Sequence, residues 1–78
     1  MINWKTTDNG LFKEFVFSDF RDAYTFMTKV AFLAEELNHH PDWRNVYNKV
    51  SIYLNTHDAG GIITEQDREM SRRIDELL

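Results

Sequence analysis

Residues 20–37 constrain the fold most, because their apolar side chains recur every three or four positions. This spacing predicts one amphipathic helix, capped at its start by Ser18 or Asp19. Asn38 tolerates left-handed backbone and Pro41 disfavours helical geometry in the residue before it, so both predict the helix end. The stripe that we expect to be buried consists of Phe20, Ala23, Tyr24, Met27, Val30, Ala31, Ala34 and Leu37. A short helix of this kind is stable only when its stripe packs on another apolar surface.

The segments on both sides of this helix show strand patterns. Asn9-Gly10 lies between two short candidate strands, residues 3–7 and 11–17, and is a strong hairpin signal. Beyond the helix, residues 45–56 follow an alternating pattern, and a separate short strand at Val46-Tyr47 is an alternative within this run. The side of this strand that we expect to face the core carries Val50, Ile52 and Leu54.

A second helix is predicted near the end of the chain. Ala59-Gly60-Gly61 predicts a loop, and Thr64 with Asp67 has the form of a capping box, which begins a helix. The buried stripe of this helix is expected to be Met70, Ile74, Leu77 and Leu78. The order β-β-α-β(β)-α predicts an α+β fold, in which a small antiparallel sheet of about four strands carries two helices on one face. We expect a single domain over residues 1–78.

The composition indicates how so short a chain becomes stable. A domain of this size buries only about 60% of the surface that its unfolded chain exposes. Disulfides cannot help, because there is no cysteine, and this fits a reducing compartment. Six Phe, three Tyr and two Trp can fill a small core or cover a subunit interface. We therefore expect a homodimer or a homotetramer.

Charge and hydropathy argue against two kinds of partner. The net charge is −4 and the basic residues are scattered, whereas direct binding of nucleic acid needs a concentrated basic surface. No apolar run approaches the length of a membrane span, and no signal region is seen at the start. The sequence predicts a soluble, cytoplasmic protein that binds neither nucleic acid nor membrane.

The three histidines are the candidate chemical groups. His39 and His40 follow the first helix, and His57 ends the segment after the alternating strand. Histidine can give or take a proton near neutral pH, and the partial negative charge of a helix C-terminus favours the protonated ring. Glu35 lies one turn before His39, where it can orient a histidine ring or further favour its protonated form. We expect the two histidine segments to meet in one polar site with acid–base chemistry.

Other interpretations of these residues remain open at this point. Isolated surface histidines are often incidental, and three histidines with Glu35 are also a conceivable zinc set, although their spacing matches no standard zinc motif. Trp4 and Trp43 can stack on a planar ligand, but aromatic residues more often pack in a core or an interface. Asp67 can be a functional acid, yet its capping-box position favours a structural role.

A longer set of residues resembles one known family. These residues are Phe17-Ser18-Asp19-Phe20, Phe26 to Ala31, Ala34-Glu35, Asn38 to Trp43, Asn45 to Val50, Thr56 to Gly61, Thr64 and Asp67. In this order they are similar to the pterin-4a-carbinolamine dehydratases. The resemblance implies dehydration of 4a-hydroxytetrahydrobiopterin to quinonoid dihydrobiopterin, in tetrahydrobiopterin recycling, without a metal or organic cofactor.

The resemblance also implies roles for individual residues. His39, His40 and His57 match the family's active-site histidines, with His39 and His57 as the acid–base pair and His40 chiefly in substrate binding. The substrate-binding set is expected to be Glu35, Asn38, His39, His40, Asn55, Thr56, His57 and Asp58.

Two further functions remain as alternatives to the dehydratase. One is a dimerisation or coactivator module that binds a partner protein through the first helix, as some animal relatives bind a homeodomain transcription factor. The other is a pterin-binding role in molybdopterin or folate metabolism.

Overall fold

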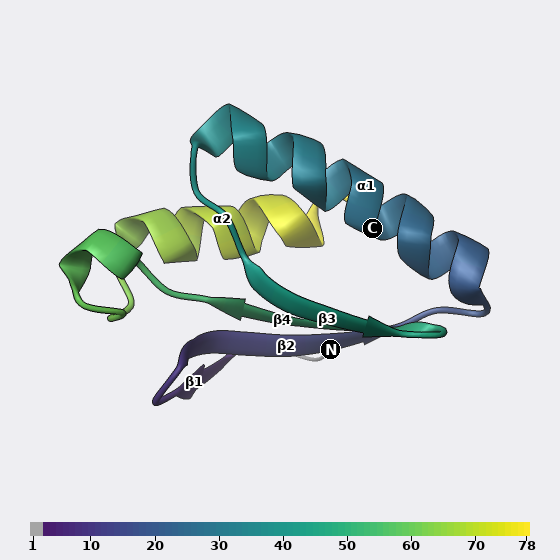
Figure 1. Ribbon diagram of the computed structural model, residues 1–78, viewed down its shortest axis with the longest axis horizontal. Coiled ribbons are helices and arrows are strands. Elements are labelled where there is room, and N and C mark those ends of the chain that lie inside the picture. Colours follow the sequence, from purple (N-terminus) through teal and green to yellow (C-terminus); the bar gives the residue numbers. More distant parts are fainter. Residues whose placement is uncertain (1–2) are drawn as a thin grey trace.

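The computed structural model describes residues 3–78 and has an α+β fold, as predicted (Figure 1). Its elements are β1 (Lys5–Thr7), β2 (Gly10–Val16), α1 (Phe20–Leu37), β3 (Asp42–Val46), β4 (Lys49–Leu54), the 3₁₀ turn η1 (His57–Ala59) and α2 (Glu65–Asp75). The four strands form one antiparallel sheet in the order β1-β2-β4-β3, and both helices lie on the same face. Neither helix of residues 3–78 is long and apolar enough to cross a membrane.

The central strand β4 confirms the predicted core face. Val50, Ile52 and Leu54 are completely buried beneath the helices. The run predicted over residues 45–56 is not one strand, however, because Tyr47 adopts a left-handed conformation with φ of 51° and the chain reverses there. β3 begins earlier than predicted, at Asp42. As an edge strand it alternates only between exposed and half-buried residues, so its apolar pattern is weak.

Helix α1 has the predicted limits, but its buried side agrees with the predicted stripe only at Ala23, Val30 and Ala34. The side chain of Asp19 caps the helix by accepting the Asp22 N–H at 2.8 Å, and Asn38 ends it in the left-handed conformation. The buried residues of the helix are Ala23, Phe26, Val30, Leu33 and Ala34. Apolar residues occur on more than one side of α1, and packing of Phe26 against the rings of Phe15 and Phe17 selects the buried one.

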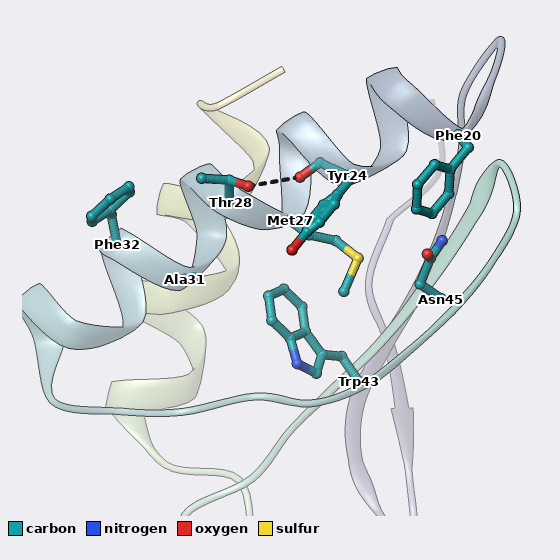
Figure 2. Close-up of a pocket in the computed structure, with 8 residues that line it drawn as sticks. All are labelled: Phe20, Tyr24, Met27, Thr28, Ala31, Phe32, Trp43 and Asn45. Atoms are coloured by element: carbon teal, nitrogen blue, oxygen red, sulfur yellow. Dashed lines mark hydrogen bonds between the residues drawn. The ribbon is translucent and has the colours of Figure 1, made fainter.

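The other apolar side of α1 is open and forms a groove with β3. Phe20, Tyr24 and Ala31, which were predicted to be buried, are exposed there. The groove has a volume of about 450 Å³ and is lined by Phe20, Tyr24, Met27, Thr28, Ala31, Phe32, Trp43 and Asn45 (Figure 2). Trp43 therefore lies in this groove and packs toward α1.

A polar cluster fixes the end of α2 against the sheet. Lys13 points to the helix-covered face of β2 and is only 9% exposed. Its ammonium group is 2.9 Å from Asp75 Oδ1, and the indole N–H of Trp4 donates to both carboxylate oxygens of Asp75. The ammonium also lies 5.0 Å from the centre of the Phe15 ring, a favourable cation–π distance. These contacts hold α2 in a fixed position on the sheet.

Gly10, the first residue of β2, lies closer to neighbouring backbone than the other two glycines do. Its φ is 115°, and a Cβ atom at this position would lie 2.2 Å from the Leu54 carbonyl oxygen. Gly60 also has positive φ, at 85°, but a Cβ there would meet nothing within 4 Å.

We predict that Gly10→Ala destabilises the protein far more than Gly60→Ala. Both variants bear the conformational penalty of an L-residue at positive φ, about 1–3 kcal/mol. Only Gly10→Ala adds a collision with backbone, which must move to relieve it. Urea denaturation of the two variants and the wild type measures the difference. Equal losses of unfolding free energy would show that the close approach is not a constraint.

Candidate active site

The end of α1 and the segment after β4 meet at one polar pocket, as the sequence predicted. The pocket has a volume of about 220 Å³ and is lined by Asn38, His39, His40, Asn55, Thr56, His57, Asp58 and Gln66. Among the predicted site residues, only Glu35 does not line it. Glu35 instead contacts His40, with Oε2 2.6 Å from His40 Nε2.

The turn at Asn38 separates the two adjacent histidines. Its left-handed conformation ends α1, and the backbone N–H of His39 donates to the Ala34 carbonyl at 3.0 Å. His39 thereby turns into the protein and is 9% exposed, whereas His40 remains on the surface with Glu35. Neighbours in extended backbone point to opposite sides, so the two rings have different environments.

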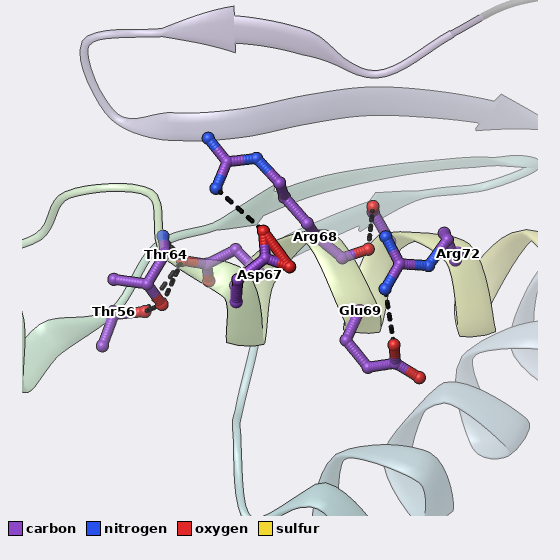
Figure 3. Close-up of polar contacts among 8 residues, drawn as sticks. Thr56, Thr64, Asp67, Arg68, Glu69 and Arg72 are labelled. Atoms are coloured by element: carbon purple, nitrogen blue, oxygen red, sulfur yellow. Dashed lines mark hydrogen bonds and ion pairs between the residues drawn. The ribbon is translucent and has the colours of Figure 1, made fainter.

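Buried Asp67 is the partner of His39. His39 Nε2 lies 2.6 Å from Asp67 Oδ1, and the Asp67 side chain is completely buried. Its other oxygen, Oδ2, accepts hydrogen bonds from the Thr56 hydroxyl and the Thr64 N–H, both at 2.8 Å (Figure 3). The bond from Thr64 belongs to the predicted capping box, so Asp67 both caps the start of α2 and holds a histidine.

The environment of Asp67 favours its ionised form. Burial by itself raises the pKa of this carboxyl group, but hydrogen bonds from the Thr64 backbone, His39 and Thr56 outweigh burial and lower the pKa below its ordinary value. An ionised Asp67 can only accept a hydrogen bond, so Nε2 of His39 carries the hydrogen and donates it to Oδ1. The Nδ1 atom of His39 makes no hydrogen bond within residues 3–78 and is the atom left for a ligand.

Two predicted ligand contacts have different surroundings. Thr56 uses its hydroxyl for Asp67 and Thr64, and its N–H for the Ile62 carbonyl at 2.9 Å, so it supports the site from within. His57 begins the turn η1 and is exposed, and its ring makes no hydrogen bond within the described residues. His57 is therefore accessible to a ligand, whereas the side chain of Thr56 is occupied.

The sequence did not reveal every residue around the pocket. Gln66 lines it from the first turn of α2, and the pairing of Asp67 with His39 was not foreseen. The sequence signals for Asp67 were the capping box and its place in the family resemblance, and neither identifies His39 as its partner across the fold. Within residues 3–78, no group of three histidine or acidic side chains is arranged to hold a metal ion.

The chain is similar to known proteins over nearly its whole length. Residues 2–77 match the protein-family model described as pterin 4 alpha carbinolamine dehydratase. A protein of Prochlorococcus marinus (strain MIT 9515), provisionally named pterin-4-alpha-carbinolamine dehydratase, is 50% identical over 74 residues, which are 95% of this chain and 76% of that protein.

Two solved structures have the same fold. A Brucella melitensis protein described as a transcriptional coactivator/pterin dehydratase is 39% identical with a TM-score of 0.88, over 95% of this chain and 80% of that one. A pterin dehydratase-like protein described as a RuBisCO assembly factor in the alpha-carboxysome is 26% identical with a TM-score of 0.83, over 97% of this chain and 89% of that one.

We predict that Asp67→Asn destabilises the fold in a pH-dependent way. Loss of the charged acceptor weakens the hydrogen bonds from His39, Thr56 and Thr64 and should reduce the unfolding free energy by about 1–3 kcal/mol at pH 7. Because the pKa of Asp67 is lowered on folding from its ordinary 3.8, its ionised form stabilises the protein above that pH. This stabilisation disappears as the pH falls through the pKa that Asp67 has in the folded protein.

Urea denaturation of both proteins between pH 7 and pH 2.5 checks this prediction. The difference between the wild type and Asp67→Asn should be constant at neutral pH and should shrink below about pH 3.8. A difference that does not change with pH would contradict a stabilising charge on Asp67.

Proposed function

This chain belongs to the pterin 4 alpha carbinolamine dehydratase family, and we propose that it removes water from a 4a-hydroxytetrahydropterin. The product is the quinonoid dihydropterin, and the reaction belongs to the recycling of tetrahydrobiopterin. The observation that carries this proposal is the polar pocket at which three histidines gather, one of them held by a buried carboxylate.

The reaction needs a proton donor and a proton acceptor. As the C4a–O bond breaks, the N5 lone pair forms a C4a=N5 double bond, and the departing hydroxyl takes a proton and leaves as water. The cationic pterin then loses a proton from nitrogen, which gives the neutral quinonoid product. Protonated and neutral histidines supply these two groups near neutral pH, and the scheme uses no metal or organic cofactor.

His39 and His57 are the proposed acid–base pair. His39 is held at Nε2 by Asp67, so its Nδ1 is presented in a fixed orientation, and the carboxylate balances the charge of the protonated ring. His57 is exposed at the same pocket and is free to exchange protons with solvent. His40, oriented by Glu35, is assigned to substrate binding together with Asn38, Asn55 and Asp58.

For Thr56 we propose another role than the substrate contact that the resemblance implies. Its hydroxyl donates to Asp67, so we propose that it supports the position of Asp67 and does not contact the pterin through its side chain.

We predict that His39→Gln and His57→Gln each lower the catalysed rate by about 10²-fold or more, because each removes one proton-transfer group. The measurement follows the decay of chemically generated 4a-hydroxytetrahydropterin with and without protein. Tyr47→Phe, at an exposed position of the β3–β4 turn, is the control and should keep the wild-type rate. Circular dichroism checks that the variants are folded. Unchanged rates in both histidine variants would overturn the assignment.

The groove between α1 and β3 supports a second proposal, the association of copies of this chain. Phe32 is 74% exposed, Tyr24 is 52% exposed and Phe20 is 48% exposed, all on the face that lines the groove (Figure 2). Large apolar side chains gathered in this way are typical of interaction surfaces. The Brucella melitensis structure is described as a transcriptional coactivator, so a partner protein is the alternative occupant of this groove.

We predict that Tyr24→Asp shifts the protein toward the monomer, because it places a charge inside the apolar groove. Thr25→Asp adds the same charge at the next position, which does not line the groove, and should leave association unchanged. Sedimentation equilibrium of both variants and the wild type gives the mass. A wild type that is monomeric throughout would reject self-association and leave a partner protein as the occupant to be sought by pull-down.

A further inference from the structure

His39 lines a second cavity besides the polar pocket. This cavity lies between the end of α1 and the first turns of α2, has a volume of about 260 Å³ and is lined by Leu37, His39, Glu65, Gln66 and Glu69. We call it the α1–α2 cavity. His39 and Gln66 line both spaces, so the two adjoin along these side chains. His39 is only 9% exposed, yet it borders two cavities, of which the proposed reaction uses one.

The lining of the α1–α2 cavity is apolar toward α1 and acidic toward α2. Half-buried Leu37 supplies the apolar part, and Glu65 and Glu69, one turn apart on α2, supply two carboxylates on the same side of that helix. Glu65 pairs with Arg68, and Glu69 pairs with Arg72 (Figure 3). Both pairs are exposed, so solvent screens them and the arginines offset only part of the negative charge. Of the described residues, no lysine or arginine lines this cavity.

The structure of the proposed substrate determines which part of it lies beside His39. In a 4a-hydroxytetrahydropterin, N5 is bonded both to C4a, from which the hydroxyl departs, and to C6, which carries the side chain of the pterin. The side chain therefore begins within three bonds of the departing oxygen, and a histidine that serves this reaction lies next to it. The α1–α2 cavity, the second space that borders His39, has room for a short chain at C6, because a water-sized group occupies about 30 Å³.

We propose that the α1–α2 cavity holds the C6 substituent of the pterin, and that Glu65 and Glu69 make the site selective for a neutral, hydroxyl-bearing chain. This inference rests on the proposed function. Carboxylates accept hydrogen bonds from hydroxyl groups and repel a carboxylate or a phosphate. Gln66 borders both cavities and is placed to hydrogen-bond to the chain where it passes from one to the other. A pterin with an anionic chain at C6 should therefore bind more weakly than one with a neutral chain.

Three pterins with the same ring test this proposal. They are unsubstituted pterin, 6-hydroxymethylpterin and 6-carboxypterin, and the last two are similar in size but differ by one negative charge. Fluorescence titration at neutral pH gives their dissociation constants. We expect the wild type to bind 6-hydroxymethylpterin about fivefold or more tightly than 6-carboxypterin, and more tightly than unsubstituted pterin. Added salt should reduce the first preference, which is electrostatic, and leave the second unchanged.

Removal of the two charges provides the matched comparison. Glu65→Gln/Glu69→Gln should bind 6-carboxypterin about as tightly as 6-hydroxymethylpterin. Glu14→Gln/Glu76→Gln changes the net charge equally at two exposed positions outside the cavity and should keep the wild-type preference. Circular dichroism checks that both proteins are folded. If the first double variant does not fold, Glu69→Gln alone keeps the acidic residue in the first turn of α2 and should remove part of the preference.

Two results would overturn this inference while dehydratase activity stands. One is equal affinity of the wild type for the 6-hydroxymethyl and 6-carboxy compounds. The other is an equal gain in affinity for 6-carboxypterin in the two double variants. A wild type that binds none of the three pterins and does not accelerate the dehydration would overturn the proposed function as well.

Discussion

The bond between His39 and Asp67 is the interaction on which the site depends. It joins the end of α1 to the first turn of α2 with a distance of 2.6 Å, and Thr56 brings the end of β4 to the same carboxylate. Three elements distant in sequence therefore converge on one buried charge. A buried carboxylate is costly unless its oxygens are paired, so loss of any one partner would weaken the positions of the others. Local helix capping and the proposed catalytic geometry use the same side chain.

The sequence predicts those features that follow from local rules. Asp19, Asn38 and the Thr64–Asp67 box set helix ends through short-range hydrogen bonds, and their positions are correct. The alternation of Val50, Ile52 and Leu54 fixes the core face of β4, because a strand with one buried side must place its apolar residues on that side. The meeting of the two histidine segments also follows from the order of elements, since the end of α1 and the end of β4 lie at the same edge of a fold of this kind.

Other features depend on packing that no local pattern records. Periodicity alone cannot choose between the side of α1 with Phe26 and Leu33 and the side with Phe20 and Tyr24, since both are apolar. Phe15 and Phe17 make the choice from the sheet side. The edge strand β3 lacks a strong pattern because neither face is fully covered. The partner of Asp67 is 28 residues away in sequence, and the hydrogen bond from the Asn55 amide to the Asn9 carbonyl spans 46 residues.

The two carboxylate–histidine pairs at this site differ in how firmly they hold a ring. His40 and Glu35 are both exposed, so solvent competes with their contact and screens it, and His40 can change its rotamer when a ligand binds. His39 has no such freedom, because its surroundings are closed and its partner is fixed by Thr56 and Thr64. A group that transfers a proton benefits from a fixed orientation, whereas a group that only binds can adapt. The difference in burial between two adjacent histidines thus follows from one left-handed residue, Asn38, and it separates their proposed roles.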